Sequence, residues 1–129
     1  MHEERDIESE PAAIAPARHW AEDHFAGAGL AERDRDLLVL LVSEVVTNAV
    51  LHAQPPVHLT IDITAERTRV EVTDGARVVP ILRNPGPDEF NGRGIALVDA
   101  IATTWGTIMH PDGAKTVWFE LRQPAPAVA

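Results

Sequence analysis

Apolar residues recur with helical spacing along residues 32–53, the longest periodic stretch of the chain. Two rows of them, each repeating every four residues, lie side by side: Leu37, Leu41, Val45 and Ala49, and Leu38, Val42, Val46 and Val50. Neighbouring rows at this spacing form one apolar stripe on an α-helix. The run Gln54-Pro55-Pro56 then ends the pattern. The stretch is therefore predicted to be an amphipathic helix that covers a core.

Strict alternation of apolar and polar residues follows this helix and predicts strands. Residues 57–63 alternate, and residues 69–73 resume the alternation after a turn at 65–67, which indicates an antiparallel hairpin. A second hairpin is predicted from residues 105–109 and 116–121, on either side of a turn at 110–113. Strands are thus expected to pair with their neighbours in sequence.

Two shorter helices are predicted outside these hairpins. Residues 17–26 follow Pro16, which suits a first helical position, and precede glycines that end helices. Residues 95–104 place branched apolar side chains on one face, whereas residues 76–91 are rich in proline and lack any period, which indicates an irregular loop. The order of elements predicts an α+β fold, a two-layer sandwich whose mixed, mainly antiparallel sheet is covered on one face by helices.

The chain has 129 residues, which is near the usual size of one domain. Residues 1–10 are charged and aperiodic, and residues 124–129 alternate proline and alanine, so both are expected to be flexible tails. The folded domain is accordingly placed at residues 11–123.

Charge and cysteine content narrow the functional classes. The formal net charge of -9 argues against binding to nucleic acid or to an anionic membrane, because both depend on clustered Lys and Arg. The absence of cysteine excludes disulfides and thiolate metal sites. The N-terminus is too acidic and polar for a signal peptide, and the apolar run 37–42 is too short to cross a membrane. A cytoplasmic location is expected.

Polar side chains stand beside the apolar stripe of the long predicted helix. Glu44, Asn48 and His52 are spaced by four residues and share one side of it. Burial of a carboxylate or amide without a partner costs on the order of a few kcal/mol, so a ligand, a metal ion or a hydrogen-bond network should satisfy them. The alternative is a helix edge that opens to water.

Three further places could carry chemistry. Asp74 stands where a strand ends, and its carboxylate could accept a hydrogen bond from an exocyclic amino group, although Asp-Gly is also a common turn pair. Gly92 and Gly94 precede a helix whose N-terminal amides could bind phosphate, although a plain loop-to-helix junction has the same sequence. Lys115 and Thr116 offer a cation and a hydroxyl at a strand start, which is ordinary on an exposed edge.

Taken together, these segments resemble the GHKL family of ATP-binding proteins, and within it the anti-sigma factor serine/threonine kinases of the RsbW and SpoIIAB type, especially their short actinobacterial members. Four motifs occur in the family's order across residues 20–121. They are the N box in Leu41-Val-Ser-Glu-Val-Val-Thr-Asn-Ala-Val-Leu-His-Ala53, the first glycine box in Val70-Glu-Val-Thr-Asp-Gly75, the second in Gly92-Arg-Gly-Ile-Ala-Leu-Val98 and the closing strand in Gly113-Ala-Lys-Thr-Val-Trp-Phe119. The resemblance implies the Bergerat fold.

The resemblance also implies cofactors and a catalytic group. Asn48 would hold the Mg²⁺ that bridges the phosphates of ATP, and Glu44 would be the general base for the attacking hydroxyl. Asp74 would accept the adenine amino group, and Thr116 would support the adenine end.

The second glycine box would lie against the phosphates of ATP. The resemblance implies that Gly92 and Gly94 approach them with their backbone, and Arg93 adds positive charge that phosphoryl transfer needs. Residues 76–91 would be a shortened ATP lid.

Two functions follow from the resemblance. The first is a kinase that binds a sigma factor and phosphorylates a Ser or Thr of a STAS-type anti-anti-sigma partner. The second is an inactive module that only binds a sigma factor or another regulator, because the first glycine box reads Asp74-Gly75-Ala76-Arg77 where the family usually has Asp-x-Gly-x-Gly. A detached catalytic domain acting on phosphorylated His or Asp ranks last, since no dimerisation helix pair is present. Relatives are often dimers, so a homodimer is a further expectation.

Overall fold

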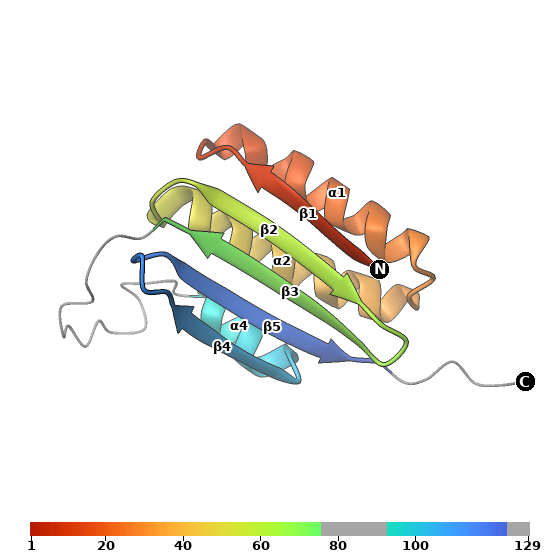
Figure 1. Ribbon diagram of the computed structural model, residues 1–129. Helices are drawn as coiled ribbons and strands as arrows, with labels where there is room; N and C mark the ends of the chain where they lie inside the picture. The colour runs from red at the N-terminus through yellow and green to blue at the C-terminus, as the bar shows by residue number, and fades with distance from the viewer. Residues whose placement is uncertain (76–92, 124–129) are drawn as a thin grey trace, which may run out of the picture.

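The computed structural model describes residues 1–75 and 93–123, with the backbone alone for 93–95. Within them five strands form one sheet in the order β1-β2-β3-β5-β4. The strands are β1 (His2–Ile7), β2 (Val57–Ile63), β3 (Arg67–Asp74), β4 (Thr104–Met109) and β5 (Lys115–Arg122), and the helices are η1 (Pro11–Ala13), α1 (Ile14–Gly27), α2 (Glu32–His52) and α4 (Arg93–Ile101). Figure 1 shows α1, α2 and α4 together on one face of the sheet. The predicted α+β sandwich is confirmed.

The described strands form both predicted hairpins, β2 with β3 and β4 with β5. Every pair of neighbouring strands is antiparallel, so this part of the sheet is not mixed. Strand β5 enters between β3 and β4 and pairs with both. The hairpin of β4 and β5 is therefore joined to the hairpin of β2 and β3 through β5, which has a neighbouring strand on each side.

The core lies between α2 and the covered face of the sheet, as the two apolar rows of the helix predict. Side chains with no exposed surface come from both layers: Phe25, Leu38, Leu41 and Val42 from the helices, and Leu59, Ile61, Val70 and Phe119 from the strands. Full burial of one such side chain stabilises the fold by about 1.5–3 kcal/mol. The other face of the sheet carries the polar residues of each alternation.

The first strand corrects an expectation. Residues 1–10 were expected to form a flexible tail, but His2–Ile7 is an edge strand that pairs antiparallel with β2 from His2 opposite Asp62 to Ile7 opposite Val57. Of its six residues only Ile7 is buried. Backbone pairing with β2 and polar side-chain contacts, rather than apolar burial, hold this strand. Its residues therefore show no apolar alternation that a sequence pattern could detect.

Other boundaries moved by a few residues at most. Helix α1 extends the predicted 17–26 in both directions, and α4 begins at Arg93 rather than at 95. The predicted loop at 76–91 and tail at 124–129 lie outside the described residues. No helix within the described ranges is both long and apolar enough to cross a membrane.

Candidate functional site

Asp74 is a buried carboxylate at the end of a strand. The alternation of β3 turns Thr68, Val70, Val72 and Asp74 toward the helices, and Asp74 is only 3% exposed. Burial of a charged carboxylate is costly unless other groups compensate it. The Lys115 ammonium lies 3.6 Å from Asp74 Oδ2 and supplies one such interaction. A charged pair therefore marks this end of the covered face.

Gly75 joins the end of β3 to the end of α2. Its amide donates a hydrogen bond to the Gln54 carbonyl over 2.7 Å, just beyond the last turn of the helix. A Cβ atom at Gly75 would collide with the carbonyl oxygen of Pro55. Only glycine allows this approach of the two backbones, which brings the C-terminal turn of α2 to the end of the sheet that holds Asp74.

Glu44 and Asn48 lie along the side of α2 and are half-buried between buried residues of the apolar stripe. Neither side chain makes a hydrogen bond or ion pair within the part of the chain that the structure describes. Four residues correspond to about 6 Å along a helix. Asn48 therefore lies one turn closer than Glu44 to the end that Gly75 anchors, and both keep polar atoms for a ligand.

Thr116 does not join this group. It pairs with Thr73 on the open face of the sheet, where its Oγ1 lies 2.7 Å from Thr73 Oγ1 and 2.7 Å from His110 Nε2. Asp74 faces the helices instead, so the sheet separates the two side chains. The residue of the closing strand motif that reaches Asp74 is Lys115.

The sequence held a signal for this difference. Lys115 shares its alternation with the apolar residues Val117, Phe119 and Leu121, whereas Thr116 alternates with Trp118, Glu120 and Arg122. Since alternate side chains of a strand share a face, Lys115 is on the covered side with the core residues. Lys115 was not selected from the sequence because Lys115 and Thr116 were considered together, although adjacent residues of a strand face opposite sides of the sheet.

The N-terminus of α4 also lies at this end of the sheet. Strand β4 follows α4 directly and, through β5, runs parallel to β3, so α4 begins where β3 finishes, as Figure 1 shows. Arg93 and Gly94 are its first residues, and Val98 is its fully buried anchor. Gly92 lies outside the described residues. A helix start carries free backbone amides and partial positive charge, which favour phosphate.

These features suit a nucleotide, which carries an amino group on its base and negative charge on its phosphates. The buried Asp74 carboxylate is an acceptor for an amino group, and the unengaged amide oxygen of Asn48 is a ligand of the kind that Mg²⁺ takes. The unengaged carboxylate of Glu44 can accept a proton. The start of α4 adds amides for phosphate. The residues present therefore fit ATP with Mg²⁺. Among the described residues no cluster of three His, Cys, Asp or Glu forms a metal site by itself.

The described residues form a two-layer α+β sandwich, with an antiparallel sheet, helices on one face and a buried carboxylate at a strand end. A family model described as the histidine kinase-like ATPase domain matches residues 7–120. The match spans most of the chain, so the chain belongs to the histidine kinase-like ATPase domain family. The resemblance to GHKL proteins is confirmed, and ATP binding is the property that this family implies.

A solved structure of the RsbU and RsbW domains of Rv1364c from Mycobacterium tuberculosis is similar to this protein, with a TM-score of 0.72 and 18% sequence identity. The similarity covers 100% of this chain and 35% of that chain, so this chain spans about a third of that structure. At this identity the likeness demonstrates the shared fold. A search of curated proteins found no match.

Proposed function

We propose that this protein is an anti-sigma factor of the cytoplasm that binds Mg-ATP and phosphorylates a Ser or Thr of a STAS-type anti-anti-sigma partner. The observation that carries the proposal is the burial of Asp74, 3% exposed, at the end of the sheet to which Gly75 ties α2. On α2, Glu44 and Asn48 keep free polar atoms on the way to that end. The similar structure from Mycobacterium tuberculosis includes an RsbW domain, which supports the same branch of the family.

Each residue of the site has a distinct role in this proposal. Asp74 accepts the adenine amino group, and Asn48 is the Mg²⁺ ligand. Gly92 and Gly94 approach the phosphates with their backbone amides, and Arg93 adds positive charge beside them. Thr116 has no role at the adenine end, since its hydroxyl lies on the opposite face with Thr73.

The chemistry is phosphoryl transfer, for which Mg-ATP supplies the phosphoryl group when bound. The hydroxyl oxygen of the partner's Ser or Thr bonds to the γ-phosphorus as the bond from that phosphorus to the leaving ADP oxygen breaks. Glu44 accepts the hydroxyl proton. Positioning and neutralisation of charge contribute most of the acceleration in such reactions, and the base adds to them.

A second function is an inactive binding module that sequesters a sigma factor. It is favoured by Ala76 and Arg77 after Gly75, where the family usually has a further glycine. The Lys115–Asp74 ion pair also favours it, because that pair satisfies the buried carboxylate without a nucleotide. The two functions differ in whether phosphate is transferred.

Calorimetric titration with Mg-ATP tests the site. We expect micromolar binding by the wild type and its loss in Asn48→Ala, with retention in Leu40→Ala, which removes an exposed side chain of the same helix. An absence of binding by the folded wild type contradicts the kinase and favours the module.

Transfer of labelled phosphate tests the chemistry. With a purified STAS-type protein that binds this chain, we expect incorporation into its Ser or Thr, reduced about 100-fold or more in Glu44→Gln. ATP affinity should stay unchanged in that variant. Equal incorporation by Glu44→Gln and wild type would exclude Glu44 as the base. Sedimentation of the protein alone gives its mass and tests the expected homodimer. Sedimentation with a sigma factor tests whether the two proteins form a complex.

A further inference from the structure

Lys115 is held beside Asp74 by the sheet and by the turn before β5. The two residues are directly opposite each other in the pairing of β3 with β5, and the Lys115 side chain is only 25% exposed. The turn is closed by hydrogen bonds from the His110 amide to the Ala114 carbonyl over 2.8 Å and from the Ala114 amide to Asp112 Oδ1 over 2.9 Å. Strand β5 therefore begins at a fixed position, with the lysine on the covered face.

The pair presents two complementary groups side by side. An ionised carboxylate only accepts hydrogen bonds, and an ammonium only donates them. The Nζ of Lys115 and the Oδ2 of Asp74 are 3.6 Å apart, which is close for an ion pair but beyond a direct hydrogen bond of good geometry. A planar ligand edge with an adjacent donor and acceptor matches this arrangement.

We propose that Lys115 determines base specificity by donating a hydrogen bond to N1 of adenine while Asp74 accepts from the N6 amino group. The inference rests on the proposed function and adds a residue to that site. The amino group and N1 are neighbours on the same edge of adenine, a donor beside an acceptor. Lys115 and Asp74 together match both groups, whereas Asp74 alone matches only one.

The same pair disfavours a hypoxanthine or guanine base bound in this orientation. Those bases carry a carbonyl oxygen in place of the amino group and a protonated N1. The carbonyl oxygen would face the Asp74 carboxylate, and the N1 proton would face the Lys115 ammonium. Two buried acceptors or two buried donors that face each other cannot form a hydrogen bond, so the affinity for such a base should be much lower.

The test compares nucleotides that differ by one atom or group. We expect 1-deaza-ATP, which lacks N1, to bind the wild type about tenfold more weakly than Mg-ATP, equivalent to about 1.4 kcal/mol. Inosine triphosphate should bind more weakly still. Lys115→Met, which keeps the length and apolar character of the side chain, should weaken ATP by a similar factor and bind ATP and 1-deaza-ATP equally. Arg122→Met, at the exposed far end of β5, is the matched control and should leave all affinities unchanged.

The outcomes separate this inference from the function on which it rests. If no nucleotide binds the wild type, both fail. Where ATP binds with loss in Asn48→Ala but 1-deaza-ATP binds the wild type equally well, the role of Lys115 is overturned and the function stands. Tighter ATP binding by Lys115→Met also overturns it, because the ammonium would then compete with adenine for Asp74. The comparison of ligands on the wild type needs no variant, so misfolding of Lys115→Met does not weaken the test.

Discussion

The guanidinium carbon of Arg69 lies 4.2 Å from the centre of the Trp118 ring, on the open face of the sheet. Arg69 also donates to Glu71 Oε2 over 2.7 Å and to Glu120 Oε2 over 2.8 Å. On β4, Gly106 leaves room for the indole, since a Cβ atom there would come within 3.0 Å of it. A tryptophan on the uncovered face is thus packed between an arginine and the backbone of the edge strand.

This contact predicts a measurable coupling. In a double-mutant cycle on the free energy of unfolding, Arg69→Met and Trp118→Leu should couple by about 0.5–1 kcal/mol, the usual strength of an exposed cation–π contact. Arg67 pairs with the same Glu120 carboxylate, so Arg67→Met with Trp118→Leu is the control cycle. Equal coupling in the two cycles would attribute the effect to Glu120 rather than to the ring.

Gly75 should not tolerate a side chain. We expect Gly75→Ala to push the carbonyl of Pro55 away and to destabilise the protein by about 1–3 kcal/mol, as overpacking does. ATP affinity should fall too, because the shift separates Asp74 from the end of α2. Urea denaturation and calorimetry measure the two effects. Gly27→Ala is the control, since a Cβ at Gly27 has no atom within 4 Å, and a comparable loss there would contradict the steric explanation.

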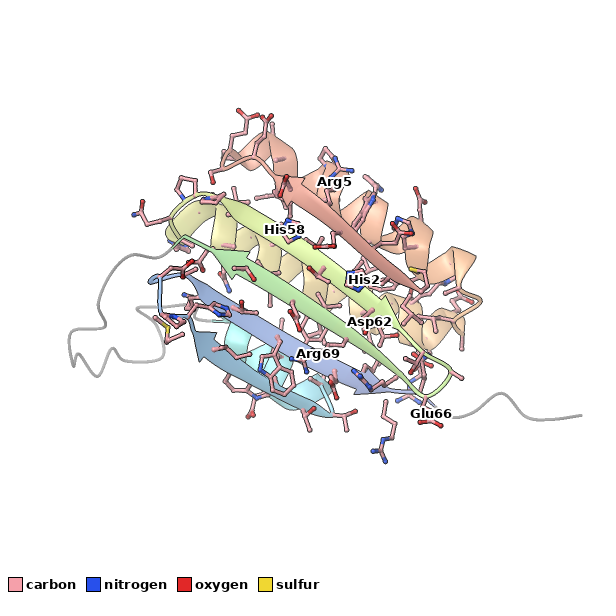
Figure 2. All side chains as sticks on the ribbon, viewed as in Figure 1. His2, Arg5, His58, Asp62, Glu66 and Arg69 are labelled. Atoms are coloured by element: carbon pink, nitrogen blue, oxygen red, sulfur yellow. The ribbon has the colours of Figure 1, made fainter. Side chains whose placement is uncertain are left out.

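His58 links the first two strands and makes their pairing dependent on pH. Its Nε2 lies 2.8 Å from Glu4 Oε1 and its Nδ1 lies 2.7 Å from Asp6 Oδ1, on the face shown in Figure 2. Hydrogen bonds with Glu4, and then with Asp6, raise the pKa of His58 above 6.5. Bonds with His58, and then with His2, lower the pKa of Glu4 below 4.5.

The pKa shifts of His58 and Glu4 define a pH range in which their interaction stabilises the fold. A raised histidine pKa stabilises the fold fully below 6.5, and this contribution is lost as pH rises through the folded value. A lowered carboxyl pKa stabilises above 4.5 and is lost as pH falls. Strand β1 should therefore be held best between about pH 4.5 and 6.5.

Amide hydrogen exchange of residues 2–7, corrected for the intrinsic rate, tests this window. Protection should decrease from pH 6 toward pH 8 in the wild type, and His58→Gln should remove most of that dependence. His2 lies 3.3 Å from Glu4 Oε2 and 3.9 Å from Asp62 Oδ1, and both contacts remain in the variant. The charged groups of β3 and β5 on this face, Arg69, Glu71 and Glu120, pair with one another. His52→Gln, at the exposed end of α2, is the control. An unchanged pH profile in His58→Gln would contradict the role of this histidine.

Thr68 and Gln123 form a buried polar pair that ties the end of β5 to the core. The Thr68 hydroxyl, fully buried, donates to Gln123 Oε1 over 2.9 Å, and Gln123 Nε2 donates to the Thr64 carbonyl over 3.0 Å. Thr68→Val keeps the shape but leaves Oε1 without that donor, so it should cost about 1–3 kcal/mol. Urea denaturation should show a change within about 0.5 kcal/mol for the control Thr60→Val on the open face. If Thr68→Val and Thr60→Val changed the free energy of unfolding equally, the change would be due to strand propensity and not to the lost hydrogen bond.

The elements with the clearest local patterns were the ones that sequence alone predicted well. The long helix was expected at residues 32–53 and lies at Glu32–His52, and the strand expected at 57–63 has those bounds. In both elements one face is buried, so apolar residues recur in the sequence with the period of the helix or the strand. Strand β1 was missed because it is an edge strand in which only one of the six side chains is buried.

The candidate site also contains residues that a local pattern could place and residues that it could not. The spacing of Glu44 and Asn48 was enough to place them on one side of the long helix, because the geometry of a single helix determines this. The choice between Lys115 and Thr116 depended on which of two adjacent residues faces Asp74, and a shift of one residue in register reverses that choice.

The sequence by itself determined the helix and strand types, the layer that each apolar face covers and the family to which the chain belongs, because these follow from periodicity and from motifs in order. Only the tertiary structure decided that β1 joins the sheet, that β5 enters between β3 and β4, and that the register of β3 with β5 sets Lys115 opposite Asp74. These features depend on pairing between distant segments. Such pairing is set by the packing of the whole sheet against its helices, which no local pattern records.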